Sequence, residues 1–259
     1  MRRPLVLVFV LFALVACTAA EESAPVQVHV GDSMVNGAVL KPYKNQWQVS
    51  VTTPAGKENP DAALWTDELS FVKVDGHQCL QRTQVATFKQ NGQVVGKTTT
   101  INVFDPKTMA PKLRSFTRHV EKTGADDSTH IEFHDLEVHF EHSGDGKIDT
   151  EEVKLETPAF DFYGGLYGLL LSTLPLKPGF SATLPSVDED APTVSWVTFK
   201  VTGEDSADAG PKGKVKVWVV EADSRLGPMK FWLSLDAPYI IRLEYTAKDN
   251  GYTWKYQMV

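Results

Sequence analysis

The side chains best suited to chemistry lie between residues 130 and 142. They are His130, Glu132, His134, His139, Glu141 and His142. Successive side chains of a β-strand point to opposite faces, so a strand here places His130, Glu132 and His134 on one face. Imidazole and carboxylate together form a ligand set for zinc or copper. The other interpretation is a solvated strand face backed by Ile131 and Phe133, and it is favoured because a half-buried strand needs polar side chains on its wet side.

A second candidate overlaps the first and has the spacing of an EF-hand calcium loop. In that alignment, oxygen-bearing side chains occupy the first, third, fifth, ninth and twelfth positions, namely Glu141, Ser143, Asp145, Asp149 and Glu152. Two features count against calcium: the first position is glutamate rather than aspartate, and residues 153–158 lack a helical pattern. The sequence Gly144-Asp145-Gly146 equally predicts a hairpin turn between two strands, which is the favoured interpretation.

Common catalytic motifs are missing from the sequence. There is no Gly-x-Ser-x-Gly elbow, no glycine-rich phosphate loop, no His-Glu-x-x-His motif and no paired-cysteine metal site. No catalytic residue is therefore assigned and no cofactor is expected. The sequence favours a protein that is not an enzyme.

The first residues have the form of a lipoprotein export signal. Two arginines precede an apolar run, and residues 14–17 (LVAC) match a bacterial lipobox ending at Cys17. This pattern predicts a signal peptide over residues 1–16, lipidation of Cys17 and a tether over residues 17–25. The alternative is ordinary cleavage after Ala20, which leaves no lipid anchor. Thr18 directly after the cysteine favours the periplasmic face of the outer membrane, because the aspartate typical of inner-membrane retention is missing from that position.

Charge and cysteine content narrow the possible partners. The formal net charge is -7 at pH 7, and removing residues 1–16 with their two arginines and no acids makes it -9. Nucleic acid is disfavoured, because phosphate backbones require clusters of lysine and arginine. After processing, Cys79 has no second cysteine in the body of the protein, so no internal disulfide is expected. Packing as a small buried residue is its favoured role.

Alternating apolar and polar residues predict β-strands along most of the chain. The clearest hairpin places Thr83–Lys89 and Val94–Val103 on either side of Asn91-Gly92, a dipeptide that tolerates positive φ. A further turn is expected at residues 125–127. A break in the alternation at Asp135 indicates a bulge.

The long apolar run after the N-terminal segment, residues 160–185, has the pattern of a buried helix. Apolar residues recur at helical spacing from Tyr163 to Leu174, and Pro175 forbids continuation, so a helix is expected over residues 161–173. Gly168 inside it costs about 1 kcal/mol relative to alanine. Such a glycine persists where a helix must approach a sheet closely; the alternative is that the segment is partly a loop.

These elements together predict one β-rich domain over residues 26–259, a curved antiparallel sheet or half-barrel with one short central helix. An N-terminal β region spans residues 26–157 and an antiparallel meander spans residues 190–259, since short connections do not allow parallel pairing. If the helix covers the concave side, the residues expected to line a cavity are Tyr163, Leu166, Tyr167, Leu170, Trp196, Trp218 and Trp232. The alternative is that the tryptophans belong to an ordinary core.

The C-terminal half carries short motifs in a fixed order: FD at residues 160–161, LPLKPGF at 174–180, VTGE at 201–204, VWVVE at 217–221, FWL at 231–233 and IRLE at 241–244. Over residues 158–259 the chain thereby resembles the bacterial exported proteins grouped as domain-of-unknown-function family 3108. The resemblance implies a β-rich envelope domain, with the α+β half-barrel of the periplasmic lipoprotein-carrier proteins as a variant. It assigns no functional residue.

The sequence therefore favours a non-enzymatic lipoprotein of the cell envelope, held to the membrane by the lipid on Cys17. Such a protein binds or carries an apolar or amphiphilic ligand, or assists envelope assembly. The alternative is a metal-binding envelope protein or metal-dependent hydrolase that uses His130, Glu132 and His134. A third hypothesis, a structural role in a complex, predicts an exposed apolar patch.

Overall fold

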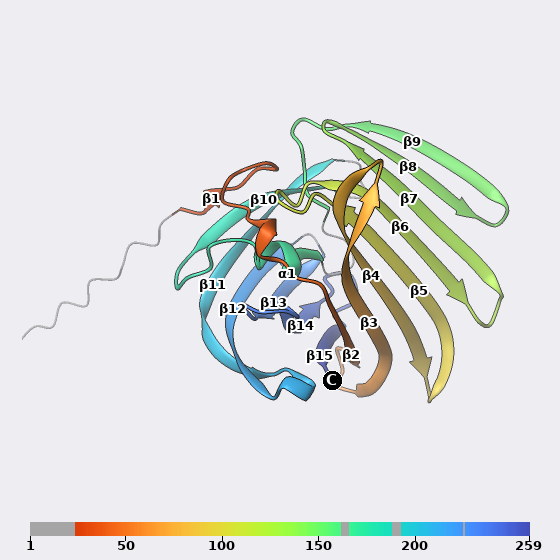
Figure 1. The fold of residues 1–259 in the computed structure, drawn as a ribbon. Helices are drawn as coiled ribbons and strands as arrows, with labels where there is room; N and C mark the ends of the chain where they lie inside the picture. The colour runs from red at the N-terminus through yellow and green to blue at the C-terminus, as the bar shows by residue number, and fades with distance from the viewer. Residues whose placement is uncertain (1–23, 162–165, 188–192, 225) are drawn as a thin grey trace, which may run out of the picture.

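The computed structural model describes residues 24–161, 166–187, 193–224 and 226–259. The predicted signal peptide, most of the predicted tether, Cys17 and Tyr163 lie outside these ranges. Within them, no helix combines the length and the apolar character needed to cross a membrane. Most of the described chain is β-strand (Figure 1).

Fifteen strands form one sheet in the order β1-β10-β11-β12-β13-β14-β15-β2-β3-β4-β5-β6-β7-β8-β9. The strands are β1 (Val26–Gln27), β2 (Tyr43–Thr52), β3 (Glu58–Val74), β4 (His77–Gln90), β5 (Gln93–Phe104), β6 (Pro111–Val120), β7 (Ala125–His134), β8 (Glu137–Gly144), β9 (Lys147–Lys154), β10 (Ser181–Val187), β11 (Val194–Asp208), β12 (Lys214–Ser224), β13 (Gly227–Leu233), β14 (Ile240–Thr246) and β15 (Thr253–Met258). Neighbours pair antiparallel, except β1 with β10. The last strand, β15, pairs with β2, which joins the two predicted halves into one curved sheet and confirms the predicted fold class.

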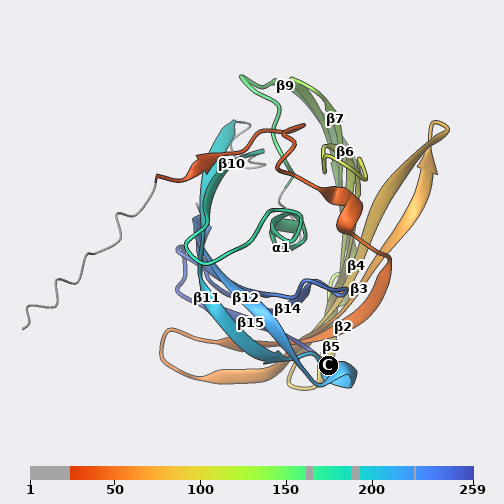
Figure 2. The ribbon, with the colours of Figure 1, turned by 60° about the vertical axis from the view of Figure 1, so that its left-hand side comes forward.

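The sheet curves around its interior without closing by hydrogen bonds between β9 and β10 (Figure 2). The segment after β9 crosses this gap, and Phe160 forms a parallel bridge with Ser186 of β10. A small core fills the same gap with side chains from β7 to β11, namely Ile131, Phe133, Val138, Phe140, Val153, Leu155, Ala159, Val187 and Val194. Apolar packing therefore takes the place of a strand ladder at the open edge of the curved sheet.

Local turn chemistry sets several of the strand ends. The predicted hairpin is confirmed, since Asn91 and Gly92 adopt φ of 51° and 77° between β4 and β5, as a two-residue hairpin turn requires. The turn predicted at residues 125–127 is wrong, because these residues begin β7 and pair with β6. The bulge predicted at Asp135 is a tight turn between β7 and β8, in which Asp135 has φ of 45°.

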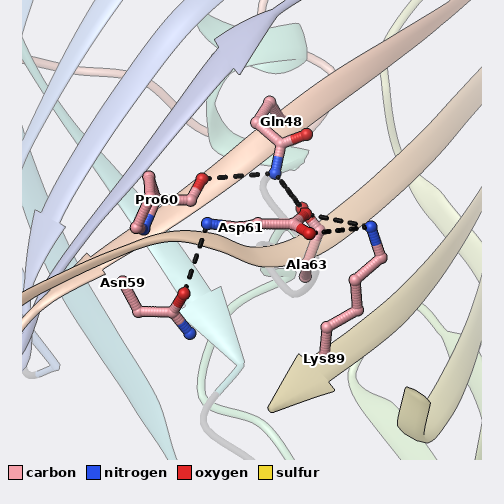
Figure 3. A network of polar contacts seen from close by, with 6 residues as sticks. All are labelled: Gln48, Asn59, Pro60, Asp61, Ala63 and Lys89. Atoms are coloured by element: carbon pink, nitrogen blue, oxygen red, sulfur yellow. Dashed lines mark hydrogen bonds and ion pairs between the residues drawn. The ribbon is translucent and has the colours of Figure 1, made fainter. Parts of the chain in front are cut away.

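Strand β3 shifts its register against β2 near Pro60. Proline fits this irregularity because it has no N–H to donate to a ladder. Figure 3 shows the contacts that bridge the three strands there. The carboxylate of Asp61 accepts a hydrogen bond of 2.9 Å from Gln48 of β2 and lies 2.9 Å from the ammonium of Lys89 of β4. The hydrogen bond from Lys89, followed by that from Gln48, holds the pKa of Asp61 below its usual value.

The central helix α1 (Leu166–Leu171) lies inside the curved sheet (Figure 2). Of the predicted helix over residues 161–173, residues 162–165 lie outside the described residues, and neither Asp161 nor residues 172–173 are helical. After Leu171 the helix ends in a tighter turn, because Thr173 N–H donates to Leu170 O, three residues earlier, at 3.0 Å. Pro175 follows and cannot continue a helix. The meander also begins earlier than predicted, at Ser181 rather than residue 190.

Gly168 explains how closely α1 approaches the sheet. A Cβ at this position would lie 2.7 Å from Cγ1 of Ile240 and 3.2 Å from Cδ1 of Phe231. Any larger side chain would push the helix off β13 and β14. The close approach expected for this glycine is therefore confirmed.

Two walls of different chemistry face α1. The apolar wall is the inner face of β10–β14, whose buried residues include Leu184, Val197, Phe199, Val220, Phe231 and Leu233. The polar wall is the inner face of β2–β6, which buries Asp67, Arg82, Gln84, Thr100, Asn102 and Arg114 beside its aromatic and aliphatic residues. Figure 2 shows the two sets of strands on opposite sides of α1.

Candidate functional site

The polar wall is built around a fully buried ion pair. Arg82 of β4 donates from Nε to Oδ1 of Asp67 at 2.7 Å and from Nη2 to Oδ2 at 3.0 Å. Both side chains have 0% exposure. Tyr43 of β2 donates its hydroxyl to Oδ2 of the same carboxylate at 3.0 Å. The planar fork of the guanidinium matches the carboxylate, so the two charges offset each other in the interior.

Burial and the ion pair shift two pKa values on this wall. Burial raises the pKa of Tyr43 well above 10, and the charge of Asp67 raises it further. Burial by itself lowers the pKa of Arg82, but the charge of Asp67, the electrostatic effect of Tyr43 and the hydrogen bonds with both residues together outweigh burial, so the pKa is raised. Tyr43 is therefore neutral and Arg82 charged throughout the physiological range.

A second buried pair connects the polar wall to the segment that leads into α1. Arg114 Nη1 lies 2.7 Å from Oδ1 of Asp161, and each side chain is 3% exposed. Asn102 Nδ2 donates to the other oxygen of Asp161 at 2.9 Å. Asp161 was expected to begin the helix, but it lies outside α1 and holds two neighbouring strands, β5 and β6, to the helix connection.

Several buried polar atoms of this wall have no hydrogen-bond partner among the described residues. They are both amide atoms of Asn45 and of Gln84, the indole nitrogens of Trp47 and Trp65, Nη1 of Arg82 and Oδ1 of Asn102. Cross-strand pairing places Trp47 opposite Trp65 and Asp67 opposite Gln84, so these groups are neighbours on one face. Buried polar groups are normally bonded, and each unbonded one costs about 1–3 kcal/mol.

The predicted cavity-lining residues divide between the two faces of the sheet. Tyr167 and Leu170 of α1 are buried in the main core, and Trp218 packs against it. The prediction for Trp196 is wrong. Trp196 is 41% exposed and contacts the ring of His29. The side chain of Leu166 is outside the described set, as is Tyr163.

Trp232 also belongs to the main core, together with its neighbours Phe231 and Leu233 on β13, and is 7% exposed. The guanidinium carbon of Arg242 stands 4.4 Å from its ring centre. Its indole nitrogen donates to Asp205 at 3.3 Å. Trp232 is therefore a core residue whose ring and indole nitrogen also contact charged side chains.

The predicted metal residues share the outer face of β7. Glu132 lies between the two imidazoles, with one carboxylate oxygen 3.5 Å from Nε2 of His130 and the other 3.5 Å from Nε2 of His134. Four residues of extended chain separate the two histidines by roughly 13 Å at their Cα atoms. One ion could therefore bind both rings only with large side-chain movement.

A tighter grouping lies on the same face, across β8 and β9. One ligand atom from each of Glu137, His139 and Glu152 lies within 4.8 Å of the other two. His139 pairs with Glu152 on β9 and with Glu132 on β7. His142 points to the opposite face and stacks on Phe140.

The favoured interpretation of the EF-hand-like stretch, a hairpin turn, is confirmed, because its residues form the β8–β9 hairpin. Asp145 and Gly146 form the turn, with φ of 50° and 71°. Glu141 pairs with Thr150, while Asp149 pairs with His142, so Asp149 lies on the opposite face from Glu141, Ser143 and Glu152. The twelve residues form straight ladders and do not wrap around a common centre.

The buried charges of the polar wall were missed by the sequence analysis, although a signal was present. Arg82 and Gln84 fall in phase with Leu80 and Ala86, which are buried in β4. A polar residue at an inward position of a strand needs a buried partner. Cys79 is free and fully buried, as expected of a small core residue.

A solved structure with a similar architecture is known. It is entitled "Crystal Structure of Beta-barrel-like Protein of Domain of Unknown Function DUF1849 from Brucella abortus", with 13% identity and a TM-score of 0.51 over 84% of this chain and 95% of that chain. At this identity the likeness concerns the fold alone. The curated proteins give no match.

The family model described as Protein of unknown function (DUF3108) matches residues 81–253. This match begins in β4 and so extends well before residue 158, where the resemblance in sequence motifs starts. It includes Arg82 and Gln84 of the polar wall, the β7–β9 hairpins, α1 and most of the apolar wall. Since it covers more than half of the chain, the protein belongs to the DUF3108 family.

Proposed function

We propose that this protein binds an amphiphile of the cell envelope between its two walls, and that it acts as a binding protein rather than an enzyme. The polar wall holds the head group and the apolar wall with α1 contacts the hydrocarbon. The observation that carries the proposal is the group of unpartnered polar atoms on β2–β5, opposite an apolar wall. An amphiphile matches both surfaces at once.

The atoms of the polar wall favour a head group with acceptor oxygens. The indole nitrogens of Trp47 and Trp65 can only donate hydrogen bonds, and the same holds for Nη1 of Arg82. The amides of Asn45 and Gln84 can donate or accept. Because Asp67 offsets the charge of Arg82, the wall does not require a charged ligand. Ester and carboxylate head groups fit this set.

The apolar side offers aromatic and aliphatic contacts next to α1. The ring of Tyr167 lies 5.6 Å from that of Phe199, and Leu169, Leu170 and Leu171 are each at most 1% exposed. Burial of hydrocarbon against such residues contributes about 0.8 kcal/mol per methylene group. A medium-length chain therefore supplies enough free energy for micromolar binding.

The envelope location in this proposal rests on residues 1–17. The lipobox pattern supports attachment through lipid on Cys17, which would keep the barrel next to its supply of amphiphiles. Mass spectrometry of the mature N-terminus tests this part separately. A lipid-modified Cys17 supports it, and an unmodified chain starting at Glu21 contradicts it.

Ligand binding is tested with the full chain purified from a bacterial envelope. Native mass spectrometry should show a co-purified amphiphile. After its removal, a long-chain fatty acid and its methyl ester should each displace a hydrophobic fluorescent dye. Absence of any bound amphiphile together with absence of displacement would overturn the proposal.

The variant Gln84→Leu sharpens this test. It removes two unpartnered amide atoms, so the ligand-free protein should gain about 1 kcal/mol in the free energy of unfolding. Loss of a hydrogen bond to the ligand should weaken ligand affinity about fivefold. The control is Gln78→Leu, an exposed position on the same strand, which should leave affinity unchanged. Equal ligand affinities for the unchanged protein and the two variants would show that the polar wall does not contact the ligand.

A further inference from the structure

The outer face of β7–β9 gathers imidazole and carboxylate groups from three neighbouring strands. His139 is at its centre, with Glu132 directly opposite on β7 and Glu152 directly opposite on β9. Glu137 shares the face two residues earlier on β8, and its Oε1 lies 2.6 Å from Nε2 of His139. The ring of His134 stands edge-on to that of His139, with 5.2 Å between centres.

We infer that Glu137, His139 and Glu152 form a binding site for a divalent transition-metal ion, best suited to Zn²⁺. Their ligand atoms lie within 4.8 Å of one another. Ligands of tetrahedral zinc, at about 2.0–2.1 Å from the metal, are separated by roughly 3.4 Å. Side-chain rotations that move the ligand atoms by about 1 Å would bring the three groups to this spacing. Glu137 and His139 have room to rotate because their side chains are 38% and 44% exposed.

The chemistry of the ligand set selects the ion. One imidazole nitrogen with two carboxylate oxygens suits Zn²⁺, whereas Ca²⁺ takes six to eight oxygen ligands. Nitrogen ligands also disfavour Mg²⁺. The two carboxylates provide negative charge to offset the cation, and Glu132 adds to it from β7.

The remaining coordination positions are open to the solvent. A depression of about 410 Å³ reaches the site, lined by His130, Glu132, His139, Glu141, Thr150 and Glu152. Water can enter there, and His134 offers a further imidazole. The site lies on the opposite face of the sheet from the two walls, so it does not depend on amphiphile binding.

The test is titration of the full chain with zinc chloride by calorimetry, after treatment with a chelator. One Zn²⁺ should bind per chain, and His139→Gln or Glu152→Gln should weaken the affinity by at least about tenfold. The matched control is His142→Gln, on the same strand but the opposite face, which should bind within about twofold of the unchanged protein. Calcium chloride in place of zinc chloride should give no heat of specific binding.

X-ray absorption of the zinc-loaded protein separates this site from binding by a thiol. Nitrogen and oxygen ligands at about 2.0–2.1 Å support the inference, and a sulfur ligand at about 2.3 Å overturns it by placing zinc on cysteine. The inference also fails if His139→Gln binds zinc as tightly as the unchanged protein. It fails equally if His142→Gln loses as much affinity as His139→Gln.

Discussion

The two walls of the curved sheet lie on either side of the same helix but differ in how they are stabilised. Strands β10–β14 present an apolar wall to α1, and Gly168 allows the helix to contact Ile240 and Phe231 directly. Strands β2–β6 instead bury charges, which are arranged in pairs such as Arg82 with Asp67. The seam between β9 and β10 is closed by a third arrangement, a small apolar core.

The two walls differ in how they tolerate substitutions and in the ligand contacts that the proposed function gives them. Apolar contacts have little directional preference, so the apolar wall tolerates changes that keep its volume. Each buried charge needs one particular partner in one geometry, so the polar wall has almost no freedom to change. The same wall carries unpartnered atoms such as those of Gln84, which lower stability and, under the proposed function, are available to bond a ligand. We therefore expect the apolar wall to set the position of α1 and the polar wall to set ligand choice.

The largest effect is expected from breaking the buried pair of the polar wall. Arg82→Leu leaves the carboxylate of Asp67 buried without its cation, which should lower the free energy of unfolding by about 3–5 kcal/mol in urea denaturation. The double variant Asp67→Leu/Arg82→Leu removes both charges and should recover most of this loss. A single variant as stable as the unchanged protein would show that the polar wall does not depend on this pair.

A smaller effect is expected from separating α1 from the apolar wall. Gly168→Val forces the helix against Ile240 and should lower the free energy of unfolding by about 2 kcal/mol, because overpacking displaces core side chains. The control Gly203→Val adds the same side chain where nothing lies within 4 Å, and it should change stability by less than about 0.5 kcal/mol. If the two variants were equally stable, the close contact between helix and sheet would not contribute to the free energy of unfolding.

The smallest effect is expected from the titration of Tyr43. Its pKa is raised well above 10 by burial and then by Asp67, so above pH 10 the unfolded chain releases this proton before the folded protein does. Stability should therefore fall as pH rises above 10, with a contribution from this one group of up to about 1.4 kcal/mol per pH unit. Tyr43→Phe should show a shallower loss between pH 9 and pH 11. If the free energy of unfolding fell equally with pH in the two proteins, the loss of stability at alkaline pH would be due to groups other than Tyr43.

Much of the fold could be predicted because it depends on residues that are close together in the sequence. The dipeptide Asn91-Gly92 specifies its hairpin through positive φ, and the helical spacing that ends before Pro175 locates α1. An error arose where the prediction rested on residue type. Trp196 has the residue type of a core side chain, but it is 41% exposed and its ring contacts His29.

The candidate metal site shows the same division on a smaller scale. Alternation alone places His130, Glu132 and His134 on one face. The tighter group depends on two turns, at Asp135 and at Asp145, that bring β7, β8 and β9 into register. A slip of one residue would turn His139 to the opposite face, so local sequence could not identify its partners.

The sequence by itself determined the succession of strands, the hairpin turns and the position of the helix, since all of these depend on residues close together in the chain. Only the tertiary structure decided which charges meet in the interior. Arg82 lies 15 residues from Asp67 and Arg114 lies 47 residues from Asp161. Such pairs form when the curvature and register of the whole sheet bring distant positions together, and a buried charge is stable only where that partner is already in place.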